Sequence, residues 1–417
     1  MPTTARSKVP PILWYSNPPW SNSGYGVIAK HVLRGLKNTG YEVGCAPNFG
    51  FSGGIIEVDG YPIYPQGGGF SEVETIEAAK RYGYGIVCPS YDIWPLEHLG
   101  RSCLENQLGF VPYIPIDHEI VLPSLVNQLR NYALYTVTLS NYGEKMVREI
   151  GVEDVCTIYP GVDCPVYRPR PETPKAEFKR NLGFDADTFL IGMVQMNKGN
   201  RKLIPRQFEA IKMFMNRNPD VKVGVYAHTS PHATGDAFDL TAVLKHLDLK
   251  VVNMPDTYQL FVGYSSDDMA AIYNGFDVLL SATSSEGFGI PIAEAQSCGV
   301  PVIATDCTSM TELLEPTPEL LVPVKTMDWN MIPARYWLPD IDKVVDALER
   351  VLKTEPKDYE QKLRDWALKK YDWNSVIIPK WDEAMQKVGQ LLEEKCWRIP
   401  KPSAYLTAVK EEVRVIP

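Results

Sequence analysis

The sequence has 417 residues, which makes two domains the default expectation, and its 45% hydrophobic and 22% charged residues are typical of a globular protein. Its net charge of −9 disfavours a general nucleic-acid coat. Eight cysteines without a CxxC pair disfavour zinc ligation and a disulfide framework, and favour a reduced, cytoplasmic protein.

The first part of the chain alternates short apolar runs with helical patterns. Continuous apolar strands separated by helices are typical of parallel sheets that are covered on both faces. The predicted strands are 12–16, 85–90, 110–117, 135–140 and 155–159, and a helix is predicted over 25–38.

A segment rich in proline and charge, 167–180, is predicted to be a linker, and the alternation restarts after it. Strands are predicted at 189–195, 221–228, 259–263, 277–282 and 300–305, with helices at 203–218, 239–247, 267–274, 291–298 and about 376–392. The pattern predicts two successive doubly wound α/β domains, with ligands in the cleft between them at the carboxyl ends of the strands.

We expect no transmembrane segment. The amino-terminal residues lack an apolar run of signal-peptide length, and no run reaches the roughly 18 apolar residues of a membrane span. Peripheral contact with a membrane stays open.

The stretch "SSEGFGIPIAEAQSCGVPVIATD" (284–306) places two glutamates eight positions apart, Glu286 in a loop and Glu294 on the following helix. Its glycines allow close backbone approach, and the start of the helix offers free N–H groups to an anion such as a diphosphate. Carboxylates so placed would hold hydroxyls at opposite ends of an elongated ligand. A solvated loop residue and a surface helix residue are an equally weighted interpretation of the spacing alone.

This stretch resembles the signature of glycosyltransferase family 4, retaining enzymes of the GT-B fold. "LSNYGEKMVREIG" (139–151), "IYPGVDCPVYRP" (158–169) and "VGYSSDDMAAIYNGFDVLLSATSSEGFG" (262–289) are further matches in the same order, so the resemblance covers most of the chain. It implies two Rossmann-like domains, 1–167 for the acceptor and 168–375 for the nucleotide sugar, with about 376–417 crossing back onto the first. It also implies that Glu286 contacts the transferred sugar, that Glu294 holds the ribose, and that Phe288, Gly289 and Ile290 bind the donor.

A basic loop, "NKGNRK" (197–202), follows the predicted strand 189–195. In the resembling family a basic residue or pair at this place binds the donor diphosphate, often as an Arg with a Lys five positions later. Here Asn197 stands five positions before Lys202, which departs in part from that pattern. We assign the role to Arg201 and Lys202 and keep Lys198 in reserve; a solvated basic loop is the alternative.

Two loops of the first domain complete the expected site. Gly24 and Gly26 open a helix directly after the first strand, where the resemblance implies contact with the donor phosphates, although an ordinary strand-to-helix turn is the alternative. Asp117 and His118 end a predicted strand, where family members often place a histidine or aspartate near the reacting sugar. A histidine satisfied within the core is the alternative for His118.

By resemblance, the chain is a retaining glycosyltransferase that moves a sugar from a UDP- or GDP-sugar to an acceptor by front-face displacement. No cofactor and no metal are expected, because fixed cations would stabilise the leaving diphosphate. The DxD-like pair, Asp185 and Asp187, precedes its predicted strand and so lies at the opposite end of the sheet.

The sequence leaves open whether the acceptor is a glycan, lipid, protein, small molecule or modified nucleic acid, and it leaves the oligomeric state open. A sugar-nucleotide epimerase of the same fold and a non-enzymatic scaffold are the alternative functions. The first would need further acid–base residues, and the second would be expected to lack a glutamate or the basic pair.

Overall fold

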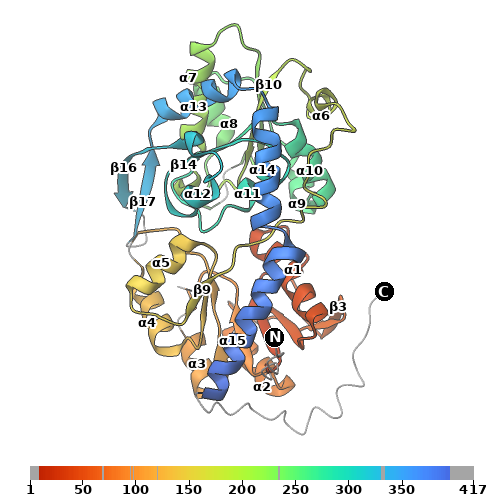
Figure 1. The fold of residues 1–417 in the computed structure, drawn as a ribbon, viewed down its shortest axis with the longest axis vertical. Coiled ribbons are helices and arrows are strands. Elements are labelled where there is room, and N and C mark those ends of the chain that lie inside the picture. The colour runs from red at the N-terminus through yellow and green to blue at the C-terminus, as the bar shows by residue number, and fades with distance from the viewer. Residues whose placement is uncertain are drawn as a thin grey trace, which may run out of the picture. The chain divides into compact units, whose positions relative to one another are not determined.

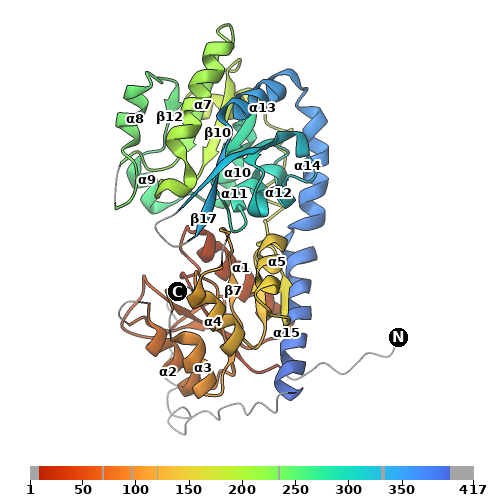
Figure 2. The ribbon, with the colours of Figure 1, turned by 90° about the vertical axis from the view of Figure 1, so that its left-hand side faces the viewer.

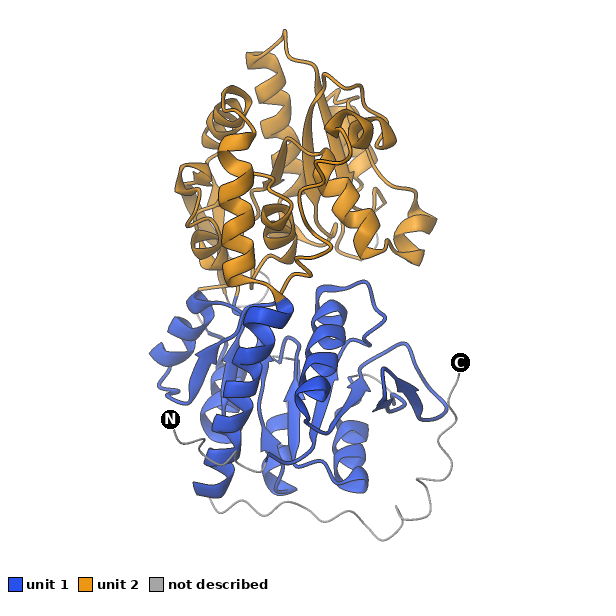
Figure 3. Ribbon diagram, turned by 45° about the vertical axis from the view of Figure 1, so that its right-hand side comes forward, with its two compact units in different colours: residues 1–116, 121–160, 373–417 blue, residues 117–120, 161–372 orange. Residues whose placement is uncertain are grey.

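The computed structural model describes residues 9–67, 70–93, 95–96, 98–119, 121–232, 235–329 and 334–394. The chain divides into two compact units, shown in different colours in Figure 3. The first unit comprises residues 1–116, 121–160 and 373–417, and the second comprises 117–120 and 161–372.

These divisions differ from the expected domain boundaries. The chain enters the second unit after residue 160 rather than 167 and leaves it after 372 rather than 375. The Val162 N–H donates to the Tyr371 carbonyl at 2.7 Å, so the segment that enters the second unit is bonded to the segment that leaves it. Residues 117–120, expected in the first domain, also group with the second unit.

The first unit is built on a six-stranded sheet in the order β3-β4-β2-β1-β5-β6 and a three-stranded parallel sheet, β7-β8-β9. All strand pairs are parallel except the β3–β4 hairpin. The strands are β1 (Ile12–Ser16), β2 (Val43–Pro47), β3 (Ile56–Val58), β4 (Tyr61–Ile63), β5 (Ile86–Pro89), β6 (Gly109–Phe110), β7 (Tyr113–Ile114), β8 (Thr136–Thr138) and β9 (Val155–Thr157).

The helices of this unit are α1 (Gly24–Thr39), α2 (Glu72–Tyr82), α3 (Leu99–Glu105), α4 (Pro123–Tyr132), α5 (Asn141–Glu149) and α15 (Ile378–Glu394). Helix α15 packs against α1 (Figure 1). Its Trp381 is fully buried, with ring centroids 5.4 Å from Trp14 and 5.0 Å from Tyr113. The last helix therefore completes the core of the first unit; the rest of the predicted crossing segment, 395–417, lies outside the described residues.

The second unit has a six-stranded parallel sheet in the order β12-β11-β10-β13-β14-β15. Counted along the unit, this order is 3-2-1-4-5-6, which is typical of nucleotide-binding doubly wound folds. The strands are β10 (Phe189–Val194), β11 (Val223–His228), β12 (Val252–Asn253), β13 (Val278–Ser281), β14 (Val302–Thr305) and β15 (Leu321–Val322); β16 (Val324–Trp329) and β17 (Arg335–Pro339) form a separate antiparallel pair.

Helices cover both faces of this sheet (Figure 2). Helices α7, α8 and α13 pack together on one face, and α6, α10, α11 and α14 pack together on the other. The helices are α6 (Lys175–Asn181), α7 (Ile204–Arg217), α8 (Leu240–His246), α9 (Thr257–Val262), α10 (Ser266–Gly275), α11 (Ile290–Ser297), α12 (Thr308–Leu313), α13 (Ile341–Lys353) and α14 (Lys357–Lys370). The predicted doubly wound α/β class is confirmed.

Three local expectations were wrong. Residues 259–263 are not a strand, because the Asp256 side chain caps α9 by accepting from the N–H groups of Tyr258 and Gln259. The single strand 110–117 is split into β6 and β7, since its prolines cannot donate to a ladder. The linker 167–180 contains the start of α6. Among the described residues, no helix is both long and apolar enough to span a membrane.

Candidate functional site

The candidate site lies at the centre of the second unit's sheet. The strand order reverses at β10, whose neighbours are β11 on one side and β13 on the other. In open parallel sheets, ligands bind outside the carboxyl ends of the strands at such a reversal. The loops that follow β10 and β13 carry the predicted basic pair and Glu286, respectively.

The loop after β10 is fixed by a buried asparagine. The Asn197 side chain donates to the carbonyls of Ser230 and Phe238 at 3.0 and 2.7 Å, and it accepts from the Phe238 N–H at 3.1 Å. A neutral amide can make both kinds of bond, whereas an arginine has no acceptor. This explains why Asn197 departs from the pattern of the resembling family: its role here is structural.

The basic pair occupies a short 3₁₀ turn, Asn200–Lys202, after which Leu203 adopts a left-handed conformation (φ 50°). That conformation costs about 1–2 kcal/mol for an L-residue, and burial of the Leu203 side chain offsets it. The Arg201 carbonyl accepts from both the N–H and the hydroxyl of Ser284, each at 2.8 Å. The two loops are thereby locked together.

The buried carboxylate of Glu286 forms ion pairs with both Arg201 and Lys202. Arg201 Nη1 donates to Glu286 Oε2 at 3.0 Å, and Lys202 Nζ donates to Glu286 Oε1 at 2.5 Å. Arg201 Nη1 also donates to the Ser285 carbonyl at 2.8 Å. Only 10% of the Glu286 side chain and 15% of the Lys202 side chain are exposed, so this ion pair is shielded from solvent.

Asp117 and His118 extend this network. Both residues group with the second unit. Asp117 Oδ2 lies 3.6 Å from Arg201 Nε, and Asp117 Oδ1 lies 3.0 Å from His118 Nδ1. The next residue, Glu119, pairs with Arg335 of β17 twice: its N–H donates to the Arg335 carbonyl at 3.2 Å, and its carboxylate lies 3.3 Å from Arg335 Nη1. All five predicted catalytic residues thus lie in one cluster.

The charges of the cluster are set by these contacts. Burial alone would raise the pKa of Asp117, but the His118 hydrogen bond and the Arg201 charge outweigh it and lower the pKa to about 2. Burial also acts to raise the pKa of Glu286, and Lys202 and Arg201 reverse this to a net lowering. Burial and the neighbouring Arg201 lower the pKa of Lys202 against the attraction of Glu286. We therefore treat Asp117 and Glu286 as carboxylates at neutral pH.

The loop after β13 turns into α11 at Gly289, whose φ of +107° is the left-handed region that favours glycine. Ser309 of α12 donates to the carbonyls of Glu286 and Phe288 at 2.9 and 2.7 Å. The Glu286 N–H donates to the Thr308 hydroxyl at 3.2 Å. Side-chain hydroxyls of α12 therefore hold the backbone of the loop that leads into α11.

Glu294, on α11, has an environment unlike that of Glu286. Tyr273 of α10 donates to Glu294 Oε2 at 2.8 Å, and Tyr167 also hydrogen-bonds to this carboxyl. Burial raises the pKa of Glu294 to about 7, against the effect of the two tyrosines. The two glutamates therefore differ in charge behaviour: one is held ionised by cations, and the other titrates near neutrality.

The remaining predicted donor-binding residues lie outside the ion-pair network. Lys198 is exposed, and Ile290 is half-buried in the first turn of α11. Phe288 is buried, with its ring 5.9 Å from that of Tyr371. In the first unit, Gly24 is exposed at the start of α1, whereas Gly26 is buried, and a Cβ there would lie only 2.3 Å from the Ser21 carbonyl oxygen. A packing role thus accounts for Gly26, while donor binding by Gly24 and Gly26 stays a prediction.

Sequence reasoning missed the two tyrosines on Glu294 and the pair formed by Glu119 and Arg335. Tyr273 has the spacing of an ordinary core residue on α10, so periodicity alone does not distinguish it. Arg335 belongs to a strand that the sequence analysis did not identify, and no local pattern connects it with Glu119.

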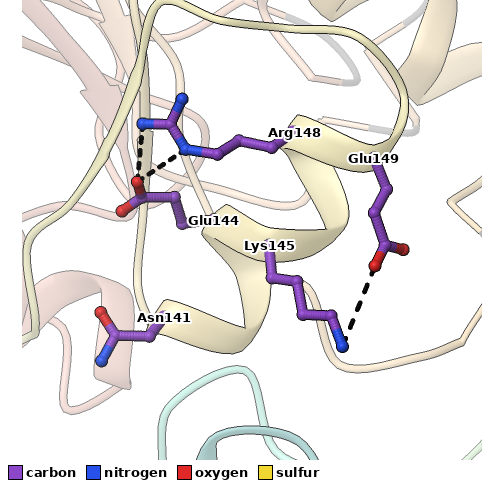
Figure 4. A pocket seen from close by; sticks show the side chains of 5 residues that line it. All are labelled: Asn141, Glu144, Lys145, Arg148 and Glu149. Atoms are coloured by element: carbon purple, nitrogen blue, oxygen red, sulfur yellow. Dashed lines mark hydrogen bonds and ion pairs between the residues drawn. The ribbon is translucent and has the colours of Figure 1, made fainter.

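A surface pocket elsewhere contains none of the predicted site residues. Figure 4 shows it on α5 of the first unit, lined by Asn141, Glu144, Lys145, Arg148 and Glu149. Arg148 pairs with Glu144 at 2.8 Å and Lys145 with Glu149 at 3.9 Å, each one helical turn apart. The pair of Lys145 and Glu149 is exposed and contributes only about 0.3–0.5 kcal/mol, whereas Glu144 is half-buried and also accepts from the Thr157 hydroxyl.

Comparisons with known proteins point to the same unit. Residues 203–353 match the family model described as glycosyl transferases group 1. A curated relative, D-inositol 3-phosphate glycosyltransferase of Arthrobacter sp. (strain FB24), is 29% identical over 151 residues, which are 35% of this chain and 32% of that protein. The chain therefore spans about a third of the length of this relative.

Solved structures match over nearly the whole chain. Sucrose-phosphate synthase from Thermosynechococcus elongatus has a TM-score of 0.69 at 18% identity, covering 93% of this chain and 99% of that one. The Anabaena protein HepE, solved in complex with UDP-glucose, has a TM-score of 0.67 at 13% identity, covering 92% and 100%. These neighbours share the fold of two Rossmann-like domains that the sequence analysis expected.

Proposed function

We propose that this chain, which carries a glycosyl transferases group 1 domain and has the GT-B fold of family 4 glycosyltransferases, transfers a sugar from a nucleoside-diphosphate sugar to an acceptor. The observation that carries the proposal is the cluster of Arg201, Lys202 and Glu286 at the strand-order reversal of the second unit. In this proposal the second unit binds the donor, and the first unit binds the acceptor.

The donor is bound by a few charged side chains of the second unit. The diphosphate lies against Arg201 and Lys202 and against the start of α11, where backbone N–H groups favour negative charge. Glu286, released from part of its pairing with the two cations, accepts from hydroxyls of the sugar. Glu294 accepts from the ribose hydroxyls while Tyr273 holds it in place.

The reaction is a retaining front-face displacement. The bond between the anomeric carbon and the diphosphate oxygen breaks, and the bond to the acceptor oxygen forms on the same face of the sugar. The acceptor's hydroxyl proton passes to the leaving diphosphate. Because negative charge grows on that diphosphate, the two fixed cations stabilise the transition state more than the ground state.

We further propose that no metal ion is needed, because Arg201 and Lys202 stand where a leaving-group cation would act. The DxD-like pair has a different role: Asp185 and Asp187 precede β10, and both pair with Lys222 on the surface. A uridine donor is the first choice, since the structural neighbour HepE was solved with UDP-glucose. No observation favours the epimerase or the scaffold alternative.

We also propose that the protein is cytoplasmic. Seven cysteines within the described residues are free thiols, and six of them are buried. Burial raises the pKa of thiols such as Cys45 and Cys298, which keeps them protonated and unreactive. Free thiols of this kind persist in a reducing compartment.

The test has two stages. Thermal unfolding is first measured with UDP-, GDP- and ADP-sugars, since a bound donor raises the unfolding temperature by mass action. Release of nucleoside diphosphate and the anomeric configuration of the product are then followed by NMR, with and without EDTA. We expect one donor class to stabilise the protein, a product of retained configuration, and little loss with EDTA.

The outcomes separate the parts of the proposal. If no nucleotide sugar binds, the proposal that the chain transfers a sugar from such a donor is wrong. A product of inverted configuration would overturn only the displacement on one face. Loss of activity in EDTA that magnesium or manganese restores would overturn only metal independence.

A further inference from the structure

The first unit carries a second set of side chains at the carboxyl ends of its strands. Strand β1 lies between β2 and β5, and the sheet order reverses there, so a ligand is expected outside the ends of these three strands. Within the residues that the structure describes, the loops concerned are 17–23 after β1, 48–55 after β2, 64–67 and 70–71 after β4, and 90–93, 95–96 and 98 after β5. The sequence alone left the segment 45–70 without an interpretation.

Large aromatic side chains stand exposed on these loops. Trp20 and Phe49 are each 44% exposed, and Phe70 is 41% exposed. Trp20 packs edge-on against Phe51 with ring centroids 6.4 Å apart, and Phe70 lies 6.2 Å from Tyr91. Aromatic rings that are exposed yet held by neighbours offer a flat apolar surface at low cost in conformational entropy.

Beneath this aromatic rim, buried polar groups are left without a full set of hydrogen bonds. Asn17, Asn48 and Ser90 directly follow β1, β2 and β5, and they are 6%, 7% and 0% exposed. The side-chain oxygen of each has no hydrogen-bond partner in the structure, although the amide nitrogen of Asn17 donates to Ser23 at 2.6 Å and the side chain of Asn48 makes a hydrogen bond with Tyr91. Buried polar atoms are nearly always satisfied, so three unsatisfied oxygens on adjacent strands indicate a ligand or ordered water that donates to them.

The charge of these loops is the third observation. None of the segments 17–23, 48–55, 64–71 and 90–98 contains a lysine or an arginine. Burial raises the pKa of Tyr91, and the negative charge of Asp92 adds to the rise. Phosphate groups are bound in proteins chiefly by arginine and lysine, which these loops lack.

We infer that these loops bind an uncharged, hydroxyl-rich acceptor, a sugar or polyol without a phosphate group, whose hydroxyls donate to Asn17 and Asn48 and whose apolar face lies on Trp20. This inference rests on the proposed function and specifies the acceptor class. It separates this chain from what its relative's name states, since that relative is an inositol 3-phosphate glycosyltransferase.

The test is direct binding without a donor. Saturation-transfer NMR is recorded on the full chain with methyl α-glucoside, maltose, myo-inositol and glycerol, and separately with glucose 6-phosphate and myo-inositol 1-phosphate. At least one neutral compound is expected to bind more tightly than any phosphate ester. In Trp20→Ala and Asn48→Leu the dissociation constant for it should rise about threefold to tenfold or more, the change expected from losing one neutral contact.

Leu104→Ala is the matched control, because Leu104 has the same 44% exposure as Trp20 and lies on α3 of the same unit. Circular dichroism checks that all variants are folded. Stronger binding of the phosphate esters, no binding of any neutral compound, or unchanged binding in both loop variants would each overturn the inference. Binding of nucleotide sugars to the unaltered chain is measured in parallel. If the chain binds a neutral sugar but no nucleotide sugar, that result contradicts the proposed function and not this inference.

Discussion

At the scale of single residues, the site shows how one sequence motif gives two carboxylates different properties. Glu286 meets two cations and stays ionised, whereas Glu294 meets two phenols and titrates near neutrality. The loop that holds Lys202 also presents Lys198 a few residues earlier, exposed and outside the ion-pair network. These contrasts lead to two predictions.

Replacing Lys202 with alanine should reduce turnover by about 10²–10³, the usual cost of removing one preorganised transition-state donor. Donor binding should weaken much less, because Arg201 and the start of α11 would still contact the diphosphate in the proposed site. Steady-state kinetics with circular dichroism measures both effects. Lys198→Ala is the control, and a larger defect there than at Lys202 would show that the diphosphate residue is misassigned.

Donor binding should depend on pH through Glu294. In the proposed site only the carboxylate would accept from both ribose hydroxyls, and as the pH falls through about 7 an increasing fraction of Glu294 is protonated. The affinity for an intact nucleotide sugar should therefore fall about tenfold between about pH 8 and pH 6. Isothermal titration calorimetry in Glu294→Gln should give weaker binding with a flat profile over this range. A parental profile in that variant would assign the titration to another group.

At the scale of elements, backbone geometry positions the site. Leu203 and Gly289 both adopt left-handed conformations, one just after the basic pair and the other just before α11. The leucine is held in this conformation by its buried side chain. The glycine has no Cβ, so the left-handed conformation has no steric cost there. Helix α11 begins at Ile290, four residues after Glu286, and the left-handed turn at Gly289 leads into it.

Gly289→Ala should lower the free energy of unfolding by about 1–2 kcal/mol, the cost of placing an L-residue in the left-handed region. The added Cβ would also lie 3.0 Å from Ile292 Cδ1, which adds strain. Urea denaturation followed by fluorescence measures the change. Gly54→Ala should be nearly neutral, since its φ is ordinary and a Cβ there meets nothing within 4 Å; equal effects of the two changes would refute the backbone argument.

At the scale of the whole molecule, the two units have separate cores, and the first unit is formed by two parts of the chain that are separated in the sequence by the second unit. Helix α15, which completes the first unit, follows the second unit in the sequence. Trp381 of α15 is fully buried against Trp14 of the first strand. We therefore expect the last helix to stabilise the first unit.

Trp381→Ala should destabilise the protein by about 3–5 kcal/mol, the usual cost of emptying a buried aromatic site. Hydrogen exchange should then increase in residues 9–116, 121–160 and 373–394, which belong to the first unit, and change little in residues 161–372. Trp329→Ala, at a side chain that is 62% exposed, should change stability by no more than about 0.5 kcal/mol. Equal loss of protection in both units would mean that they do not unfold separately.

The sequence by itself determined the doubly wound class, most of the strands and helices, and the gathering of Arg201, Lys202 and Glu286. Parallel strands deliver the residues that follow them to one edge of the sheet, so local patterns suffice for these features. The sequence analysis missed the Asp256 cap that makes α9 a helix, and the tertiary structure alone decided that residues 117–119 join the second unit. It also decided that Glu294 is held by Tyr273 and Tyr167. Each of these depends on contacts between residues far apart in the chain or on a side-chain cap, and burial and pairing there outweigh the local propensity that a sequence pattern records.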